Sequence, residues 1–289
     1  MIKKGIILAG GLGTRMSPLT KAVNKQLLPL HDKPLIFYPL SILMLAGIKN
    51  ILVIVNKGQL TQFKKIIPEN NNLGMNIQYK EQFKPGGLPE AFTIGEKFIG
   101  NENVALILGD NFFYGQNLTN ILRKNSNLKN GARIFIHPVN KPQNYGVAYL
   151  NNKRKVIKLI EKPKKTKSNL AVTGLYFFDN KVVNFTKKLK PSKRGELEII
   201  DLLNIYRRKK SLNAEFIGRG GAWLDTGSIK DYYNASNFIS TIEHRQGLKI
   251  ACLEEIALNN NWIGKQQIKN SINFYGNCDY SKYLRTLII

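Results

Sequence analysis

The 289-residue chain is long enough for one large domain, or for one domain with a small appendage. A chain of this size buries roughly three-quarters of its unfolded surface, and it has only two cysteines, so a disulfide-stapled scaffold is excluded. No run approaches the ~18 apolar residues of a membrane span, and the apolar stretch after the basic N-terminus is too short for a signal peptide. We therefore expect a cytoplasmic protein with no membrane partner.

The net charge of +25 raises the possibility of nucleic-acid binding. However, only ten of the 44 basic residues are arginines, and lysine, asparagine and isoleucine, which share A/T-rich codons, are all abundant. The densest basic clusters, 162–167 and 207–210, are short and contain no aromatic residues. We expect no nucleic-acid partner, because a few placed cations for a small anionic substrate account for the charge equally well.

The first 110 residues alternate between strand and helix patterns. Apolar runs predict strands over 5–9, 51–55, 76–81 and 104–108, and helical spacing predicts helices over 39–46, 60–66 and 88–98. This alternation is typical of an open α/β domain with a mainly parallel central sheet flanked by helices, in which ligands bind beyond the carboxyl ends of the strands.

The middle of the chain follows a different pattern. Closely spaced strands are predicted over 132–139, 146–150, 156–161 and 171–178, which indicates mixed or antiparallel additions to the sheet. Helices are predicted over 198–209 and 231–243, and the chain after Gly247 has a helical pattern. We expect a catalytic domain over residues 1–245 and a small, mainly helical C-terminal appendage over residues 246–289.

A glycine-rich turn follows the first predicted strand, with Gly10, Gly11 and Gly13 ahead of Thr14 and Arg15. Glycines let backbone N–H groups approach phosphate oxygens closely, and a guanidinium binds two such oxygens at once. The spacing matches neither a P-loop nor a dinucleotide fingerprint. A tight strand-to-helix turn is the structural alternative, but the position of Arg15 favours a polyphosphate site.

Acidic and basic residues stand at several predicted loops and strand ends. Lys25 lies in an apolar, proline-stiffened segment, which argues against a solvated side chain. Asp110 follows an apolar strand and Asp225 ends a second apolar segment, so the two form a natural pair for Mg²⁺. An Asx-turn or helix cap is the alternative for Asp110.

Two further segments carry groups suited to a sugar phosphate. Glu161 and Lys162 stand at the end of a predicted strand, where a surface ion pair is the alternative, and Arg194 could reach a phosphate. The three histidines have no neighbours that indicate a catalytic triad, and neither cysteine has metal-ligand spacing. We therefore expect neither covalent catalysis nor a zinc site.

Together these motifs resemble the sugar-nucleotide pyrophosphorylases, a family of nucleotidyltransferases, and are most similar to its glucose-1-phosphate thymidylyltransferase branch. The resemblance extends from about Lys4 to about Gly264, and it rests on the segments 10–15, 25–29, 33–41, 108–115, 171–177, 194–198 and 222–227.

The resemblance implies the Rossmann-like fold of nucleotide-diphospho-sugar transferases and the transfer of a deoxythymidylyl group from dTTP to glucose 1-phosphate. The products would be dTDP-glucose and pyrophosphate, in the first step of dTDP-rhamnose or other deoxysugar synthesis. It also implies Mg²⁺ as cofactor and a homotetramer, a dimer of dimers.

Residue roles carry over by position. The resemblance implies catalytic roles for Arg15 and Lys25, and Mg²⁺ binding by Asp110 and Asp225. The residues implied to bind the nucleotide are Gly10, Gly11, Gly13, Thr14, Gln26, Gln82 and Gly87. The residues implied to bind the sugar phosphate are Tyr145, Gly146, Glu161, Lys162, Val172, Tyr176 and Arg194.

The chain departs from the family pattern at several points. Near the base site, the usual Asp-Gly-Leu-Ala-Gln is replaced by Gly86-Gly87-Leu88-Pro89-Glu90, which removes a carboxylate and predicts relaxed base selectivity. Gly221 replaces a common tyrosine near the family's regulatory nucleotide site, and the chain from Lys265 onward hardly matches. Two alternatives stay open: a uridylyltransferase that prefers UTP, which the Lys25-Gln26 segment disfavours, and a non-catalytic nucleotide-sugar binding protein.

Overall fold

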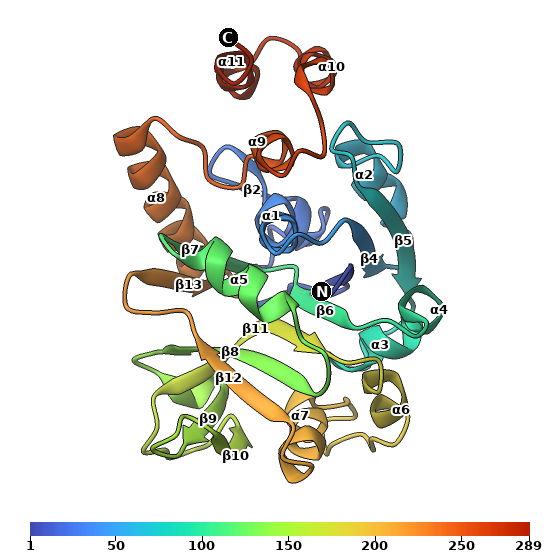
Figure 1. Cartoon of the computed structure of the whole chain (residues 1–289), viewed down its shortest axis with the longest axis vertical. Coiled ribbons are helices and arrows are strands. Elements are labelled where there is room, and N and C mark those ends of the chain that lie inside the picture. Colours follow the sequence, from blue (N-terminus) through green and yellow to red (C-terminus); the bar gives the residue numbers. More distant parts are fainter.

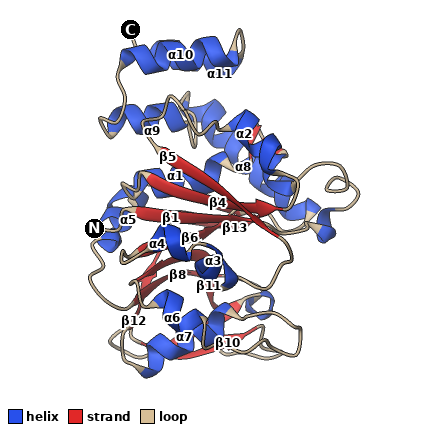
Figure 2. Cartoon of the chain, turned by 90° about the vertical axis from the view of Figure 1, so that its right-hand side faces the viewer, coloured by secondary structure: helices blue, strands red, loops and turns tan.

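The computed structural model describes residues 1–289, and its centre is a nine-stranded mixed sheet with helices on both faces (Figures 1 and 2). The main path of the sheet runs in the order β10-β9-β11-β6-β1-β4-β5, with β8 paired to β11 and β12 paired to β8. The strand bounds are β1 (Lys4–Ala9), β4 (Asn50–Asn56), β5 (Asn76–Gln82), β6 (Val104–Leu108), β8 (Ala132–Pro138), β9 (Gly146–Leu150), β10 (Val156–Glu161), β11 (Leu170–Phe178) and β12 (Leu212–Phe216).

Strands β6, β1, β4 and β5 are parallel, as the alternating pattern predicts, whereas β11 pairs antiparallel with β6 and β9. The first half therefore has the parallel α/β arrangement and the middle supplies the mixed additions. Two short pairs lie outside the main sheet: β2 (Pro29–Leu30) with β3 (Lys33–Pro34), and β7 (Asn111–Gly115) with β13 (Gly221–Asp225).

The two faces of the sheet bury separate apolar clusters because successive strand residues point to opposite sides. On one face Ile7 packs in the cluster formed with α1 (Phe37–Leu45), α2 (Leu60–Ile66), α5 (Leu118–Ser126) and α9 (Leu253–Asn259). On the other face Ile6 packs with α3 (Glu90–Ile94), α4 (Glu96–Ile99), α6 (Val182–Thr186) and α7 (Ile199–Arg208). This double coverage explains why the strands read as continuous apolar runs.

The helix expected over 88–98 is wrong in detail, because α3 and α4 are separated at Gly95. A Cβ on Gly95 would lie 2.9 Å from Ile6 Cδ1, so the chain approaches the sheet closely there. The prediction also missed strands β2, β3, β7, β12 and β13 and helices α5 and α6.

Helix α8 (Ile229–Gln246) packs on a third cluster that contains Met16 and Leu35, next to the glycine-rich turn. The chain then forms α9, α10 (Lys265–Tyr275) and α11 (Asp279–Thr286), which confirms the helical pattern after Gly247. Helix α9 joins the main core through Leu253, whereas α10 and α11 pack on each other at one end of the molecule (Figure 1).

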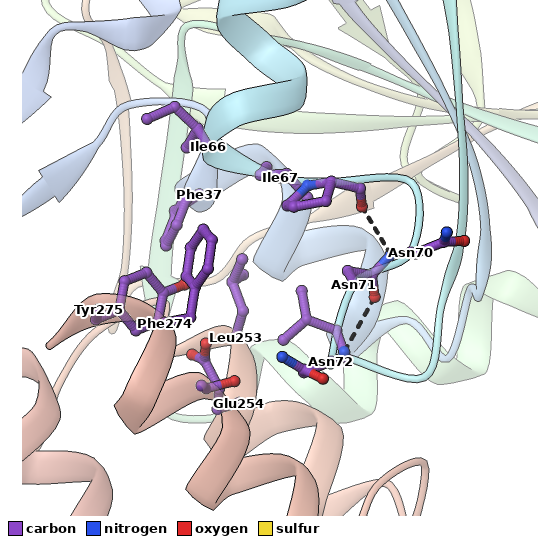
Figure 3. A pocket seen from close by; sticks show the side chains of 13 residues that line it. Phe37, Ile66, Ile67, Asn70, Asn71, Asn72, Leu253, Glu254, Phe274 and Tyr275 are labelled. Atoms are coloured by element: carbon purple, nitrogen blue, oxygen red, sulfur yellow. Dashed lines mark hydrogen bonds between the residues drawn. The ribbon is translucent and has the colours of Figure 1, made fainter.

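A small cavity of about 80 Å³ lies between α10, α9 and the loop after α2 (Figure 3). Glu254 lines it but is only 1% exposed, and its carboxylate accepts a hydrogen bond of 2.7 Å from Tyr280 Oη. Burial raises the pKa of Glu254. None of the helices is both long and apolar enough to cross a membrane.

Candidate active site

A cleft of about 630 Å³ opens beyond the carboxyl ends of β1 and β6. It brings together eleven of the predicted site residues: Thr14, Arg15, Asp110, Tyr145, Gly146, Glu161, Lys162, Val172, Tyr176, Arg194 and Asp225. The other predicted residues, Gly10, Gly11, Gly13, Lys25, Gln26, Gln82 and Gly87, do not line this cleft. Of these, Lys25 contacts the cleft through its ion pair with Asp110.

The glycine-rich turn leaves β1 and enters a single 3-10 turn over Thr14–Met16. Gly13 has φ 63°, a left-handed conformation that glycine adopts without a steric penalty, and its carbonyl accepts hydrogen bonds from Met16 N (2.9 Å) and Thr20 Oγ1 (2.8 Å). A Cβ on Gly11 would meet no atom within 4 Å, so the backbone there borders open space. The turn therefore exposes a side-chain-free stretch of backbone next to Arg15.

Lys25 forms a buried ion pair with the first predicted metal ligand. It begins a 3-10 turn capped by Asn24, whose Oδ1 accepts a hydrogen bond from Gln26 N (2.8 Å). Lys25 is 6% exposed, and its Nζ lies 2.5 Å from Asp110 Oδ2. Burial alone would raise the pKa of Asp110, but the charge and hydrogen bond of Lys25 hold that pKa below its usual range. The prediction that Lys25 is not a solvated side chain is confirmed.

Asp225 lies beside Asp110 because β13 pairs with β7. Asp225 is opposite Asn111 in this ladder, and Thr226 donates to the Asp110 carbonyl from both its N (3.1 Å) and its Oγ1 (2.8 Å). Burial and the negative charge of Asp110 raise the pKa of Asp225 to about 6. Two carboxylates from distant parts of the sequence are thus held together against their mutual repulsion.

This arrangement fits a divalent cation. Burial and the charge of Asp110 keep the pKa of Asp225 raised although Lys25 and Arg15 both lower it. Arg15 lies close by, since a Cβ on Gly227 would be 2.6 Å from Arg15 Nη2 and 3.0 Å from Asp225 Oδ1. Carboxylate oxygens next to groups that bind phosphate are a donor set that Mg²⁺ prefers.

A second group of charges, Glu161, Lys162 and Arg194, also lines the cleft. Glu161 Oε1 lies 3.9 Å from Lys162 Nζ and 3.8 Å from Arg194 Nη2. Burial raises the pKa of Glu161 despite these cations. Arg194 makes its shorter contacts to Glu198, with both carboxylate oxygens 2.8 Å from Nη2, so Glu198 holds the guanidinium at the mouth of the cleft.

Apolar and aromatic side chains complete the wall. Tyr145 packs edge-on against Trp223, with ring centroids 5.1 Å apart, and Val172 and Tyr176 are both buried. A Cβ on Gly146 would lie 2.7 Å from Ile200 Cδ1, so glycine permits the close approach of β9 to α7.

Sequence reasoning missed Asn111, which is 2% exposed and links three parts of the site. Its Oδ1 accepts from Trp223 Nε1 (2.6 Å) and Gly174 N (3.0 Å), while its Nδ2 donates to Asp110 Oδ1 (3.0 Å). Its position directly after Asp110 was the available signal.

A second missed cluster lies away from the cleft, where His31, Asp32 and Glu243 could in principle hold a metal. Lys33 and Lys249 each make ion pairs with both Asp32 and Glu243, so the carboxylates there already have cationic partners. The cluster joins the β2–β3 hairpin to the end of α8.

Comparison with known proteins agrees with this geometry. Residues 4–242 match the Nucleotidyl transferase family. The chain is 48% identical over 285 residues to the glucose-1-phosphate thymidylyltransferase of Neisseria meningitidis serogroup A, covering 99% of both chains. It is 49% identical to the enzyme of the same name from Xanthomonas campestris pv. campestris, covering 99% of this chain and 97% of the relative.

Solved structures point the same way. A Bacillus anthracis protein described as a glucose-1-phosphate thymidylyltransferase superposes with a TM-score of 0.75 and 38% identity, over 81% of this chain and 94% of that chain. UDP-glucose pyrophosphorylase complexed with UDP-glucose gives a TM-score of 0.73 and 28% identity, over 84% and 100%. Alignments over 285 residues also extend into the tail beyond Lys265, where the motifs had indicated little similarity. By its sequence and its fold, the chain belongs to the nucleotidyl transferase family.

Proposed function

We propose that this protein is a glucose-1-phosphate thymidylyltransferase, which transfers the deoxythymidylyl group of dTTP to glucose 1-phosphate and releases pyrophosphate. The observation that supports this proposal is that one cleft is lined by Asp110, Asp225 and Arg15 together with Lys162 and Arg194. Its full-length relatives at 38–49% identity bear the same name.

The chemistry follows from charge. A phosphate oxygen of glucose 1-phosphate attacks the α-phosphorus of dTTP in line, and pyrophosphate leaves. The nucleophile is already an anion, so the reaction needs no general base, and no histidine or cysteine lines the cleft. The main barrier is the approach of two polyanions, which positioned cations lower.

Each charged side chain has a separate task in this proposal. Arg15 and the backbone of Gly10, Gly11 and Gly13, together with Thr14, hold the triphosphate, and Lys25 stabilises charge that develops on the transferred phosphate. Lys162 and Arg194 hold the sugar phosphate, while Tyr145, Gly146, Glu161, Val172 and Tyr176 form the sugar pocket. Gln26, Gln82 and Gly87 contact the base.

Mg²⁺ would be held by Asp110 and Asp225, and it would neutralise phosphate charge when bound. Before it binds, Lys25 keeps Asp110 ionised, so one ligand is ready at neutral pH. Asp225, whose pKa is raised to about 6, becomes ionised as the pH rises through that value and can then act as the second ligand.

The proposal extends to the biological setting. Production of dTDP-glucose would be the entry to dTDP-rhamnose and related deoxysugars, and the family resemblance further implies a cytoplasmic homotetramer built as a dimer of dimers. A UTP-preferring enzyme is the second candidate, and the 28% identical UDP-glucose pyrophosphorylase structure is the observation that favours it.

Pyrophosphate release separates these candidates. The purified protein is given glucose 1-phosphate and Mg²⁺ with dTTP, UTP, CTP or GTP in parallel. Turnover led by dTTP supports the proposal, and turnover led by UTP replaces it with the second candidate. If no pyrophosphate is released with any of the four nucleotides, the enzymatic role is refuted and a non-catalytic nucleotide-sugar binding protein is the remaining hypothesis.

A further inference from the structure

The departure from the family pattern at residues 86–90 forms a defined hydrogen-bonded unit. Gln82 ends β5 and is 5% exposed, and Glu90 begins α3. Glu90 Oε2 accepts hydrogen bonds from Gln82 Nε2 and from Gly86 N, the latter at 2.8 Å. A single carboxylate oxygen thus connects the end of β5 with the loop that leads into α3.

Gly86 is what allows this contact. A Cβ on residue 86 would lie 2.7 Å from Glu90 Oε2 and 2.8 Å from its Cδ, so the Glu90 carboxyl group fills the space that a side chain on residue 86 would occupy. Replacement of the pattern's aspartate by glycine and of its glutamine by Glu90 therefore moves a carboxylate from residue 86 to residue 90. The segment 86–90 therefore still carries one carboxylate, at a different position from that of the family pattern.

The carboxylate decides which way the amide of Gln82 faces. A primary amide can present either its carbonyl or its NH₂, and the two orientations have nearly the same shape. An ionised carboxylate only accepts hydrogen bonds, so it selects the orientation in which Nε2 faces Glu90. In that orientation Oε1 faces Gly10, where a Cβ would lie 2.4 Å from it.

Gln82 Oε1 receives no hydrogen bond from the chain, although its amide nitrogen is paired. Gln26 lies on the other side of β1, against Gly109, and its Oε1 is buried without a partner. Gly10 and Gly109 follow the neighbouring parallel strands β1 and β6. The Oε1 atoms of Gln82 and Gln26 are therefore two acceptors without a hydrogen-bond partner, and they lie near the strand ends where the glycine-rich turn begins.

We propose that Glu90 is a positioning residue that fixes the Gln82 carbonyl toward the nucleobase, and that this selects bases with an N3–H donor against cytosine. This inference rests on the proposed function, since it takes Gln82 to contact the base. Thymine and uracil donate from N3, whereas cytosine has only an acceptor there. A fixed Gln82 carbonyl accepts a hydrogen bond from the N3–H of thymine or uracil. With cytosine, the same carbonyl faces the N3 lone pair and is repelled by it.

The test is equilibrium binding of dUTP and dCTP in the presence of Mg²⁺ and without glucose 1-phosphate, measured by calorimetry. These two nucleotides have the same sugar and phosphates and differ only in the base. The wild-type protein should prefer dUTP by more than tenfold. In Glu90→Gln, an amide partner accommodates both orientations of Gln82, and the preference should fall by about tenfold or more.

Matched variants separate positioning from a loss of folding. Glu96→Gln makes the same chemical change in an exposed α4 ion pair with Lys187 and should keep the wild-type preference. In a Gln82→Ala background, Glu90→Gln should cause no further change in the ratio.

Equal binding of dUTP and dCTP by the wild type, or no nucleotide binding, overturns the inference. So does an unchanged ratio in a folded Glu90→Gln variant. Pyrophosphate release is measured separately, which distinguishes the two hypotheses. Selective binding by the wild type without turnover, together with a reduced dUTP/dCTP ratio in Glu90→Gln, contradicts the proposed function and supports the role of Glu90. Normal dTTP turnover by the wild type, together with an unchanged dUTP/dCTP ratio in Glu90→Gln, supports the proposed function and contradicts the role of Glu90.

Discussion

Replacing Lys25 with methionine would remove a charge from a buried ion pair while keeping most of the side-chain volume. Lys25 is 6% exposed and lies 2.5 Å from Asp110, whose side chain is 22% exposed. Breaking a buried pair costs about 3–5 kcal/mol, and the partial exposure of Asp110 places the expected loss near 3 kcal/mol. Turnover should fall at least ~10²-fold, as when one preorganised electrostatic group is lost.

The pH dependence of stability provides a sharper signature. In the wild type, the lowered pKa of Asp110 contributes stability above the ordinary carboxyl range, and this contribution is lost as the pH falls through the lowered pKa. Without Lys25, burial and the charge of Asp225 dominate and raise the pKa of Asp110. The variant should then lose stability as the pH rises, so its deficit relative to the wild type is larger at pH 8 than at pH 5.

Urea unfolding at both pH values and pyrophosphate release at pH 8 test this reasoning. The matched control is Lys33→Met, because Lys33 is 3% exposed and pairs with Asp32 and Glu243 outside the cleft. It should lose stability and keep its turnover per folded molecule. Near-wild-type turnover in Lys25→Met, or a stability deficit that does not grow with pH, refutes the role given to Lys25.

Three further predictions concern other parts of the molecule. Because the pKa of Asp225 is raised to about 6, its protonated form contributes stability below the ordinary carboxyl range that is lost as the pH rises through about 6. Asp225→Asn should therefore raise the unfolding midpoint of the metal-free protein at pH 7.5 and abolish stabilisation by Mg²⁺; an unchanged Mg²⁺ effect contradicts the metal site. Glu254→Gln should raise the melting temperature more at pH 8 than at pH 5, since burial raises the pKa of Glu254, and an equal effect at both pH values would exclude that cause. Gly87→Ala should cost about 2 kcal/mol or more and raise the nucleotide KM, because Gly87 has φ 98° and a Cβ would lie 2.1 Å from the Leu197 carbonyl oxygen. Gly195→Ala, at φ 78° with no atom within 4 Å, is its control, and equal losses in the two variants would show that the Leu197 contact has no effect.

The strands and helices of the first half follow closely from sequence because local pattern and tertiary burial agree there. The predicted helix over 60–66 and strand over 104–108 coincide with α2 and β6, since both faces of this sheet are covered and the apolar runs are unbroken. The break at Gly95, which lies against Ile6 of β1, escaped prediction because the helical apolar pattern continues through it. Strand β13 was missed because it pairs only with β7, which is distant in the sequence.

The candidate site likewise has features that the sequence indicated and features that only the tertiary structure determined. Sequence alone indicated the residue types at the candidate site, because the glycine turn, Arg15, Lys25 and the aspartates at strand ends can be recognised from their order along the chain. Only tertiary structure decided their pairing: Lys25 with Asp110, Arg194 with Glu198, and Asp225 beside Asp110 through β13 and β7. Glu90 is an example: its hydrogen bond to the Gln82 amide depends on the space that Gly86 leaves free, and neither contact can be read from the sequence. Burial and partner charge are properties of the folded chain, and they set the pKa values and side-chain orientations that the chemistry requires.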